Sequence, residues 1–583
     1  MKTMFTAFHL PKLCPTNIIA IALWVVSGFF NTAGAQFTTP APVPPTLSGN
    51  TINLTLQNGT QQFYPGYNTA TIGYNGNHLG PTLVLQKGQE VTINVTNTLG
   101  DTTTTHWHGL HVAPVNDGGP HSHIMDGETW SPAFTVMDNA ATYWYHPHLH
   151  GKTLKQVVKG AAGLIIVQDN TENAIALPRT YGSDDFPLVF QFLTFNNATK
   201  QIEMTDDADN AVLVNGVIQP YLDVPAQVVR LRLLNASSHR FFEFSFSDNR
   251  TFYQITSDCG LLNAPVSMNR LMLASGERAE ILVSFAGQSG STLYLKQLGT
   301  QLPAGYPGGP AGMGMGGMAL GPLDNTDFNL LKMNVTGPTA NAITNIPAEL
   351  VQNTVWSSAG TFIRNITITA SPMMSTTNFF LNGVKFDEEV INFTAIQGNT
   401  EIWNITNQSM MPHPFHIHGN HFYVLSVNGA TPPANQQGRK DVITIPPMMG
   451  SVQLIIRYED FADPDMPYMY HCHILSHEDN GMMGQFLVLP PATGTLPQNP
   501  ANQNPAATLY PNPAAETLTL QLNPALLTFG KIEIFNTSGQ PVLQQNITQT
   551  FTVLNIASLP SGLYFVKITG AGITSTLKAV VEK

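Results

Sequence analysis

The chain has 583 residues, of which 43% are hydrophobic and 11% are charged, and its formal net charge is −12 at pH 7. This length leaves room for about three or four domains, and the hydrophobic share suffices for a sizeable core in each. No run of Lys or Arg stands out against the acidic balance, so the composition argues against nucleic acid as a partner.

The segment 1–35 has the pattern of a signal peptide. Lys2 and Lys12 precede an apolar run from Ile18 to Phe30, and Ala33-Gly34-Ala35 is an A-x-A cleavage site. The run is shorter than the roughly 20 residues that span a bilayer. We therefore expect an exported protein without a transmembrane segment.

Three parts of the chain share an Asn-Gly turn followed by a strand-like run. The turns are Asn75-Gly76, Asn215-Gly216 and Asn382-Gly383, and the runs are VTINVTN (91–97), VVRLRLLN (228–235) and EIWNITN (401–407). Alternating β-branched residues separated by Gly, Pro and Asn turns favour Greek-key β-sandwiches. We predict an all-β fold with three related sandwich domains, over residues 36–172, 173–340 and 341–493.

The chain changes character after a Pro/Asn/Gln-rich linker at 494–506. Residues 507–583 contain the alternating segments TLTLQL, KIEIFN, GLYFVKI and TLKAVVEK and no His, which predicts a small C-terminal β-sandwich without metal ligands. Between Pro303 and Pro322, a composition dominated by Gly, Pro and Met forbids a packed element and predicts a flexible surface loop.

The chain has three cysteines, Cys14, Cys259 and Cys472. Removal of the signal peptide would leave two, and Cys472 lies among histidines that could bind a metal together with it. Cys259 then has no partner within the chain, so we predict no disulfide and a buried apolar thiol at this position.

The segment Tyr470–Met483, YHCHILSHEDNGMM, is the densest cluster of metal-binding side chains. If 470–474 is a strand, His471 and His473 point to one face and Cys472 to the other, so two metal centres can lie back to back.

A thiolate with two imidazoles and a weak axial thioether is the ligand set of a blue-copper site. Cys472 and His477 would supply two of these ligands, and either Met482 or Met483 would supply the thioether. A tetrahedral zinc cluster is the alternative, because zinc takes the same Cys and His ligands.

Three further segments contain an H-x-H pattern, which on a strand places both imidazoles on one face. They are HWHG (106–109), HPH (146–148) and HPFHIHG (413–419). A single H-x-H is usually a pair of surface or core histidines, but four in one chain predict several metal centres. The candidate ligands are His106, His108, His146, His148, His413, His416, His418, His471, His473 and His477.

These segments resemble the four copper motifs of the multicopper oxidases. The stretches THWHGLHV, WYHPHLHGKTLKQVVKGAAGLIIVQD, HPFHIHGNHF and YHCHILSHEDNGMMG are most similar to the bacterial copper-efflux, or cuprous, oxidases. The resemblance covers roughly residues 50–490. It implies three cupredoxin-like domains and four copper ions per chain, with no copper ligands in the second domain.

The resemblance also implies how the ligands are shared. Type I copper would be bound by His413, Cys472 and His477, with Met482 as the weak axial ligand. Type II copper would be bound by His106 and His416, and the type III pair by His108, His146, His148, His418, His471 and His473. Because domains one and three each supply four of these eight His, the trinuclear cluster is expected at their interface.

Two carboxylates match the family's proton donors, Asp117 in NDGGP and Glu478 in HEDNGMM. On the residues alone, each has the context of a solvated loop carboxylate. Five His beside the motifs fall outside the family pattern and are predicted to be hydrogen-bonded neighbours or surface residues: His111, His121, His123, His150 and His421.

The activity that the resemblance implies is one-electron oxidation of a reductant coupled to four-electron reduction of O2 to water. Cys472, bonded to His471 and His473, would carry electrons from the type I site inward and is therefore counted as a catalytic residue. Copper nitrite reductase shares the fold but lacks a trinuclear centre, and non-catalytic relatives have usually lost ligands. Both alternatives fit the intact motif set less well. We expect a monomer.

The reductant is open between Cu(I) and phenolic or aromatic compounds. Ten of the 21 Met lie between 373 and 483, and soft thioethers suit Cu(I), although Met is also a common core filler. The long Met/His-rich insertion of the cuprous oxidases is missing. Ser409 also replaces the family's acidic residue four places before His413. A laccase-like phenol oxidase is therefore the second possibility.

The C-terminal segment resembles the sorting domain of type IX secretion. The matching stretches are LYPNPA (509–514), IFNTSGQPV (534–542) and LPSGLYFVKI (559–568). This resemblance implies the secretion machinery as a partner, and removal of this domain or its use for surface attachment. The protein would then pass through the periplasm and end up secreted or on the outer cell surface.

Overall fold

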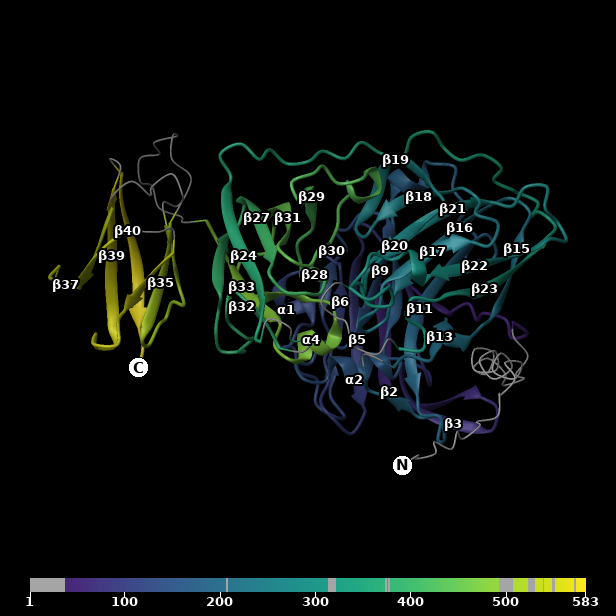
Figure 1. Cartoon of the computed structure of the whole chain (residues 1–583), viewed down its shortest axis with the longest axis horizontal. Coiled ribbons are helices and arrows are strands. Elements are labelled where there is room, and N and C mark those ends of the chain that lie inside the picture. The colour runs from purple at the N-terminus through teal and green to yellow at the C-terminus, as the bar shows by residue number, and fades with distance from the viewer. Residues whose placement is uncertain are drawn as a thin grey trace, which may run out of the picture.

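The computed structural model describes residues 37–205, 208–312, 321–372, 375, 378–491, 507–522, 530–537, 539–547, 551–570 and 573–583. The expected signal peptide, the linker at 494–506 and the Met-rich part of the 303–322 loop (313–320) lie outside the described residues. The described chain is built almost entirely of strands, so the predicted all-β fold is confirmed (Figure 1).

Two five-stranded sheets form the first domain. One has the order β1-β4-β10-β9-β6 and the other β3-β2-β5-β7, with β8 beside β5. The strands are β1 (Thr46–Leu47), β2 (Thr51–Tyr64), β3 (Tyr67–Tyr74), β4 (Thr82–Gln86), β5 (Glu90–Thr98), β6 (His106–His108), β7 (Thr129–Trp130), β8 (Ala133–Thr135), β9 (Ala141–His146) and β10 (Gly163–Gln168). Every second residue of β5 is buried, which gives the sandwich its core.

The second domain also has two sheets. One has the order β14-β13-β11-β16-β21-β18-β19, with β12 beside β11, and the other has the order β15-β23-β22-β17-β20. The strands in the first half of this domain are β11 (Asp185–Phe195), β12 (Ile202–Glu203), β13 (Ala211–Val214), β14 (Val217–Ile218), β15 (Tyr221–Pro225), β16 (Val228–Asn235) and β17 (Phe242–Phe246). The others are β18 (Phe252–Ser257), β19 (Gly260–Met268), β20 (Leu271–Leu273), β21 (Arg278–Ser284), β22 (Thr292–Leu298) and β23 (Asp327–Thr336).

Strands β11 and β16 are buried along their whole length instead of on alternate residues. One face packs in the core of the second domain, while Val189 and Leu234 pack against Trp144 and Leu164 of the first domain. The two sandwiches therefore share a continuous buried interface.

The third domain pairs the sheets β25-β24-β27-β31-β29 and β26-β33-β32-β28-β30. The strands are β24 (Phe362–Ala370), β25 (Phe379–Leu381), β26 (Phe393–Ile396), β27 (Thr400–Asn407), β28 (His413–Ile417), β29 (Phe422–Val427), β30 (Val442–Ile445), β31 (Gly450–Arg457), β32 (Asp463–Cys472) and β33 (Met483–Leu489). A buried cluster that includes Trp403, Phe415 and Cys472 fills the space between these sheets.

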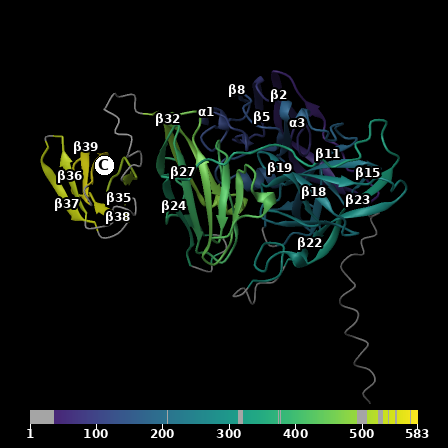
Figure 2. The same ribbon diagram turned by 90° about the horizontal axis from the view of Figure 1, so that it is seen from above.

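A separate sandwich follows, with the sheets β34-β35-β38 and β37-β36-β39-β40. Its strands are β34 (Ala507–Tyr510), β35 (Thr517–Leu522), β36 (Lys531–Asn536), β37 (Pro541–Asn546), β38 (Phe551–Asn555), β39 (Gly562–Gly570) and β40 (Ile573–Val581). Both views show it (yellow) beside the third domain, on the side away from the second domain (Figures 1 and 2).

The repeat expected from the Asn-Gly turns is present in the three larger sandwiches. Strand β2 pairs in parallel with β5, β11 with β16, and β24 with β27. Asn75, Asn215 and Asn382 each have a positive φ, and the side-chain oxygen of each accepts a hydrogen bond from a residue of the first strand of its pair. Asn tolerates this conformation better than most residues, which explains its place in all three copies.

Helices are few and short in the described part of the chain. They are α1 (Pro114–Asp117), α2 (Thr153–Val158), α3 (Asn170–Asn173) and α4 (Leu475–Asp479), with 3-10 turns η1 (Gly299–Gln301) and η2 (Ala434–Gln436). Helix α1 of the first domain contacts β32, and α2 contacts α4, so the first domain packs against the His-rich segments of the third. No helix in the described ranges is long and apolar enough to cross a membrane.

Candidate metal centres

The first centre lies within the third domain. His413 begins β28, Cys472 ends β32, and His477 lies in α4. The Sγ atom of Cys472 is 3.5 Å from Nδ1 of His413 and 3.6 Å from Nδ1 of His477. Met482 packs in the same buried cluster as Cys472, whereas Met483 pairs with His471 in the sheet, which favours Met482 as the thioether neighbour.

This centre is closed to solvent. The ring of Phe379 lies 4.7 Å from that of His413 and 4.3 Å from that of His477, and the Ser409 hydroxyl lies 2.8 Å from Nε2 of His413. Burial raises the pKa of the Cys472 thiol and lowers the pKa of His413. A thiolate here would be an uncompensated buried charge, so the site fits a bound cation that stabilises it.

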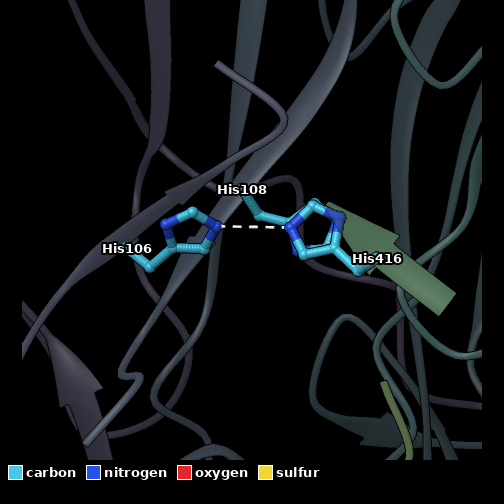
Figure 3. Close-up of side chains that lie close together, drawn as sticks. All are labelled: His106, His108 and His416. Carbon is cyan, nitrogen blue, oxygen red and sulfur yellow. Dashed lines mark hydrogen bonds between the residues drawn. The ribbon is translucent and has the colours of Figure 1, made fainter. Parts of the chain in front are cut away.

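The second centre lies between the first and third domains. Ligand nitrogens of His106, His108 and His416 all lie within 4.8 Å of one another. Figure 3 shows His106 facing His416 across the interface, with their Nε2 atoms 3.4 Å apart. The rings of His108 and His416 stack with centroids 3.8 Å apart.

Two further triplets adjoin it. His108, His146 and His473 form one, and Nδ1 of His108 lies 3.4 Å from Nε2 of His146. The other contains His148, His418 and His471, whose Nε2 atoms are 3.0–3.2 Å apart.

The expected H-x-H geometry holds although the strands are shorter than predicted. Strand β32 ends at Cys472 instead of continuing to 474. The rings of His471 and His473 nevertheless lie on the side of the interface with centroids 5.8 Å apart, while Cys472 faces the domain core.

The donor set fits metal ions. All eight His of these triplets are buried, and burial lowers the pKa of those for which a shift is resolved, which are His108, His146, His148, His416, His418, His471 and His473. Neutral imidazole is the form that binds metals. Nε2 of His473 is buried without a hydrogen-bond partner in the described part of the chain, as expected of a nitrogen that faces a metal.

Asp117 and Glu478 are not solvated loop carboxylates, so that sequence-based interpretation was wrong. Asp117 is 2% exposed, and its Oδ2 lies 2.7 Å from Nδ1 of His418. Glu478 is 0% exposed, with Oε2 3.2 Å from Nδ1 of His471 and Oε1 3.5 Å from Nδ1 of His148. Burial, and then the neighbouring Asp479, raise the pKa of Glu478. Helices α1 and α4 place these carboxyl groups against the cluster.

Asp441 and Arg278 also contact the cluster, and neither was predicted from the sequence. Nε2 of His108 lies 3.3 Å from Oδ1 of Asp441, and Nδ1 of His416 donates to the Asp441 carbonyl over 2.8 Å. Arg278 of the second domain binds both carboxylate oxygens of Asp441 over 2.6 Å. No local pattern marks either residue, because 163 positions separate them in the chain. The second domain therefore contacts the cluster through Arg278, while none of its described residues belongs to the triplets.

The other predictions on single residues have mixed outcomes. Cys259 is a buried free thiol, as predicted, but its surroundings are not apolar, because it donates to Oδ2 of the ion-paired Asp441 over 3.1 Å. His121 binds the side chain of Gln485 in the third domain over 2.6 Å, while His123 is exposed.

Comparisons with known proteins agree with this geometry. Multicopper oxidase family models match residues 55–172 and 363–492, and the model of the secretion system C-terminal sorting domain matches residues 508–582. The multicopper oxidase mco of Staphylococcus haemolyticus is 36% identical, over 75% of this chain and 88% of its own. The cell division protein FtsP of Photorhabdus laumondii is 32% identical, over 78% of this chain and 93% of its own.

Among solved structures, the laccase-like multicopper oxidase CueO from Ochrobactrum sp. is 33% identical with a TM-score of 0.69, over 77% of this chain and 100% of its own. The family implies copper, and the resemblance noted in the motifs is confirmed on both counts, oxidase and sorting domain. This chain belongs to the multicopper oxidase family.

Proposed function

We propose that this protein is an exported oxidase that binds four copper ions and couples one-electron oxidation of a reductant to four-electron reduction of O2 to water. The observation that carries the proposal is Cys472, which faces His413 and His477 in the domain core while its chain neighbours His471 and His473 belong to the interface triplets.

The triplets support a specific assignment of ligands. The type I site consists of His413, Cys472 and His477 with Met482 as axial ligand, and the type II site of His106 and His416. The type III sites are His108, His146 and His473 on one side and His148, His418 and His471 on the other. Copper bound there would supply the redox chemistry, with one-electron uptake at the type I site and O2 reduction at the other three.

The carboxylates have two tasks. Asp117 accepts from Nδ1 of His418, and Glu478 lies near Nδ1 of His148 and His471, so that the Nε2 atom of each ring is left to face the metal. Because Glu478 is buried beside two of these rings, it is also placed to hold a proton beside the cluster and deliver it during oxygen reduction.

A metal count with an absorption spectrum tests this proposal. We expect close to four copper ions per chain, O2 uptake with a reductant, and a strong band near about 600 nm from thiolate-to-copper charge transfer. Absence of that band would contradict the type I assignment, and absence of O2 uptake would contradict the oxidase.

Two alternatives remain distinguishable by the same measurements. The FtsP relatives are named for cell division, which keeps a non-catalytic copper-binding relative as the second candidate. The complete triplets argue against it, and they argue equally against copper nitrite reductase, which needs no trinuclear centre. A protein that binds copper but consumes no O2 would favour the second candidate.

The reductant is proposed to be Cu(I) or a phenolic compound. Met448 and Met449 are 54% and 63% exposed, and their backbone amides bind the carbonyls of Ser409 and Asn407, close to His413. Exposed thioethers beside the type I site favour Cu(I). Steady-state oxidation of Cu(I) and of a dimethoxyphenol, each with and without added Cu(II), decides between them. Fast phenol oxidation without added copper, with slow Cu(I) turnover, would favour a laccase.

Export is proposed from the sorting domain together with the signal-peptide pattern. We expect the secreted material to be a monomer that begins near Gln36 and lacks the region after about residue 500, the region that the sorting-domain resemblance implies is removed. Mass spectrometry of the secreted protein measures both ends. Full-length protein kept in the cytoplasm would contradict the localisation.

A further inference from the structure

The two segments that meet at the type II site share a longer pattern than H-x-H. Residues 106–111 read HWHGLH and residues 416–421 read HIHGNH, so both follow H-x-H-G-x-H. The first two His of each segment belong to the interface triplets. The third ones, His111 and His421, belong to none of them.

The glycines of this pattern turn the chain in the same way. Gly109 and Gly419 have φ values of 89° and 64°, in the region that disfavours other residues. A Cβ on Gly109 would lie 2.3 Å from Oδ2 of Asp441, and a Cβ on Gly419 would lie 2.1 Å from the Tyr468 ring. Both positions therefore require glycine.

The third His of each segment reaches across the interface to the glycine of the other. Nδ1 of His111, in the first domain, bonds the carbonyl oxygen of Gly419 in the third. Nε2 of His421, in the third domain, donates over 2.7 Å to the carbonyl of Gly109 in the first. Each bonded carbonyl directly follows a metal-site residue, His418 or His108.

A carboxylate of the opposite domain also lies beside each of these two His. Nε2 of His111 lies 3.2 Å from Oδ2 of Asp460 in the third domain, and Nε2 of His421 lies 3.6 Å from Oδ1 of Asp138 in the first. Oδ1 of Asp138 also accepts the backbone N–H of His111 over 2.9 Å. Burial lowers the pKa of His421 to about 3, so this ring is neutral and carries its single proton on Nε2 when it donates to Gly109. Together, the contacts form a closed loop through both domains.

We infer that His111 and His421 are positioning residues. Each holds the ligand-bearing loop of the opposite domain in place, and we call this pair of reciprocal contacts the clasp. The clasp keeps the His ligands of the first and third domains correctly placed relative to each other in the trinuclear cluster. The inference rests on the proposed function only in calling the triplets copper sites. Neither residue touches the triplets as a ligand, and each acts through the backbone carbonyl next to one.

The two positions use different ring nitrogens, which provides a matched test. The side-chain amide nitrogen of Asn lies near the place of Nδ1, and that of Gln near the place of Nε2. Asn should therefore replace His111, and Gln should replace His421. The swapped variants, His111→Gln and His421→Asn, keep an amide but misplace its donor. A role in packing or volume alone would not reverse the preference between the two positions.

Copper content by mass spectrometry and the electron paramagnetic resonance signal of type II copper would be measured in all four variants during titration with a chelator. We expect the matched variants to retain type II and type III copper about 10- to 100-fold more tightly than the swapped ones. The blue type I band should be the same in all four, because that site lies within one domain.

The melting temperature of the metal-free variants is the second measurement. The matched variants should melt above the swapped ones at both positions, which tests the clasp independently of any copper assignment. If Asn and Gln rank in the same order at both positions, or all four variants behave alike in both measurements, the clasp is overturned. If the wild-type protein binds no type II copper, the proposed function is overturned instead. The order of the melting temperatures of the four variants would still test the clasp in that case.

Discussion

The two candidate metal regions are built in different ways. The type I region takes all its residues from the third domain, and its ligand atoms face the hydrophobic core between two sheets. The interface region takes its His from the first and third domains. It is stabilised by a buried ion pair between Asp441 of the third domain and Arg278 of the second. The first should therefore depend on the folding of one sandwich, and the second on how three sandwiches dock.

Buried ion pairs contribute to the docking of the domains. Arg278 and Asp441 are each at most 1% exposed, and Lys440 of the third domain binds Asp258 and Glu277 of the second over 2.7 and 3.1 Å. Removing one member of such a network leaves its partner unpaired in a low-dielectric interior, which is costly. Substitutions in the two regions should therefore have effects that differ in kind and in size.

The largest effect is expected for Cys472→Ser. It removes the thiolate from the type I region with little change in volume, so the fold and the interface region should persist. We expect complete loss of the blue colour and of substrate oxidation, with type II and type III copper retained, as measured by absorption, paramagnetic resonance and O2 uptake. Substantial turnover in this variant would mean that electrons do not pass through Cys472.

The converse substitution is Arg278→Met. It leaves the buried Asp441 carboxylate without its cation at the domain interface, and we expect a loss of about 3–5 kcal/mol in the free energy of unfolding. Type II and type III copper should be lost at lower chelator concentration than type I copper. Chemical denaturation and copper titration measure the two effects.

The matched control for it is Arg250→Met. Arg250 also pairs with an aspartate, Asp248, over 2.6 Å, but Asp248 is 47% exposed and lies away from the interface. We expect a change below about 1 kcal/mol and no change in copper binding. Equal effects of the two substitutions would show that the interface pair has no special role.

A smaller, pH-dependent effect is expected for Asp138→Asn. Burial raises the pKa of Asp138 from 3.8 to about 6. The folded state therefore binds this proton more tightly than the unfolded state, and the associated stability is lost as the pH rises from about 4 through 6. Asn has no charge to bury and can still accept from the His111 N–H.

The variant should accordingly be more stable than the wild type at pH 8, by about 1–3 kcal/mol, and the difference should vanish near pH 4. Thermal unfolding of both proteins at the two pH values measures it. A difference that is the same at both values, or larger at pH 4, would contradict the shifted pKa.

The smallest effect is expected for Lys152→Ala. Lys152 pairs with Asp101 over 2.5 Å just before α2, but their side chains are 36% and 42% exposed. Solvent and salt screen such pairs, so we expect a loss below about 1 kcal/mol and no change in either metal region. A loss comparable to that of Arg278→Met, measured by the same denaturation, would mean that exposed charges hold the interface.

Local patterns were enough to predict the all-β fold and the grouping of the metal-binding residues. An H-x-H segment on or beside a strand places both rings on one side whatever the rest of the chain does, which is why His106 and His108, or His471 and His473, could be paired in advance. The Asn-Gly turns likewise predicted three copies of one sandwich, because a positive φ is a local property of the residue.

Contacts between distant residues could not be predicted in this way. Asp117 meets His418, Glu478 meets His148 and Arg278 meets Asp441, and in each pair the two residues lie at least 163 positions apart. His111 and His421 likewise contact glycines of the opposite domain. No sequence pattern distinguishes these residues, because a polar loop can have the same sequence whether it faces water or another domain. The docking of the first and second domains onto the third decides this, because it removes the water and leaves these carboxylates paired with imidazole rings or a guanidinium from distant parts of the chain.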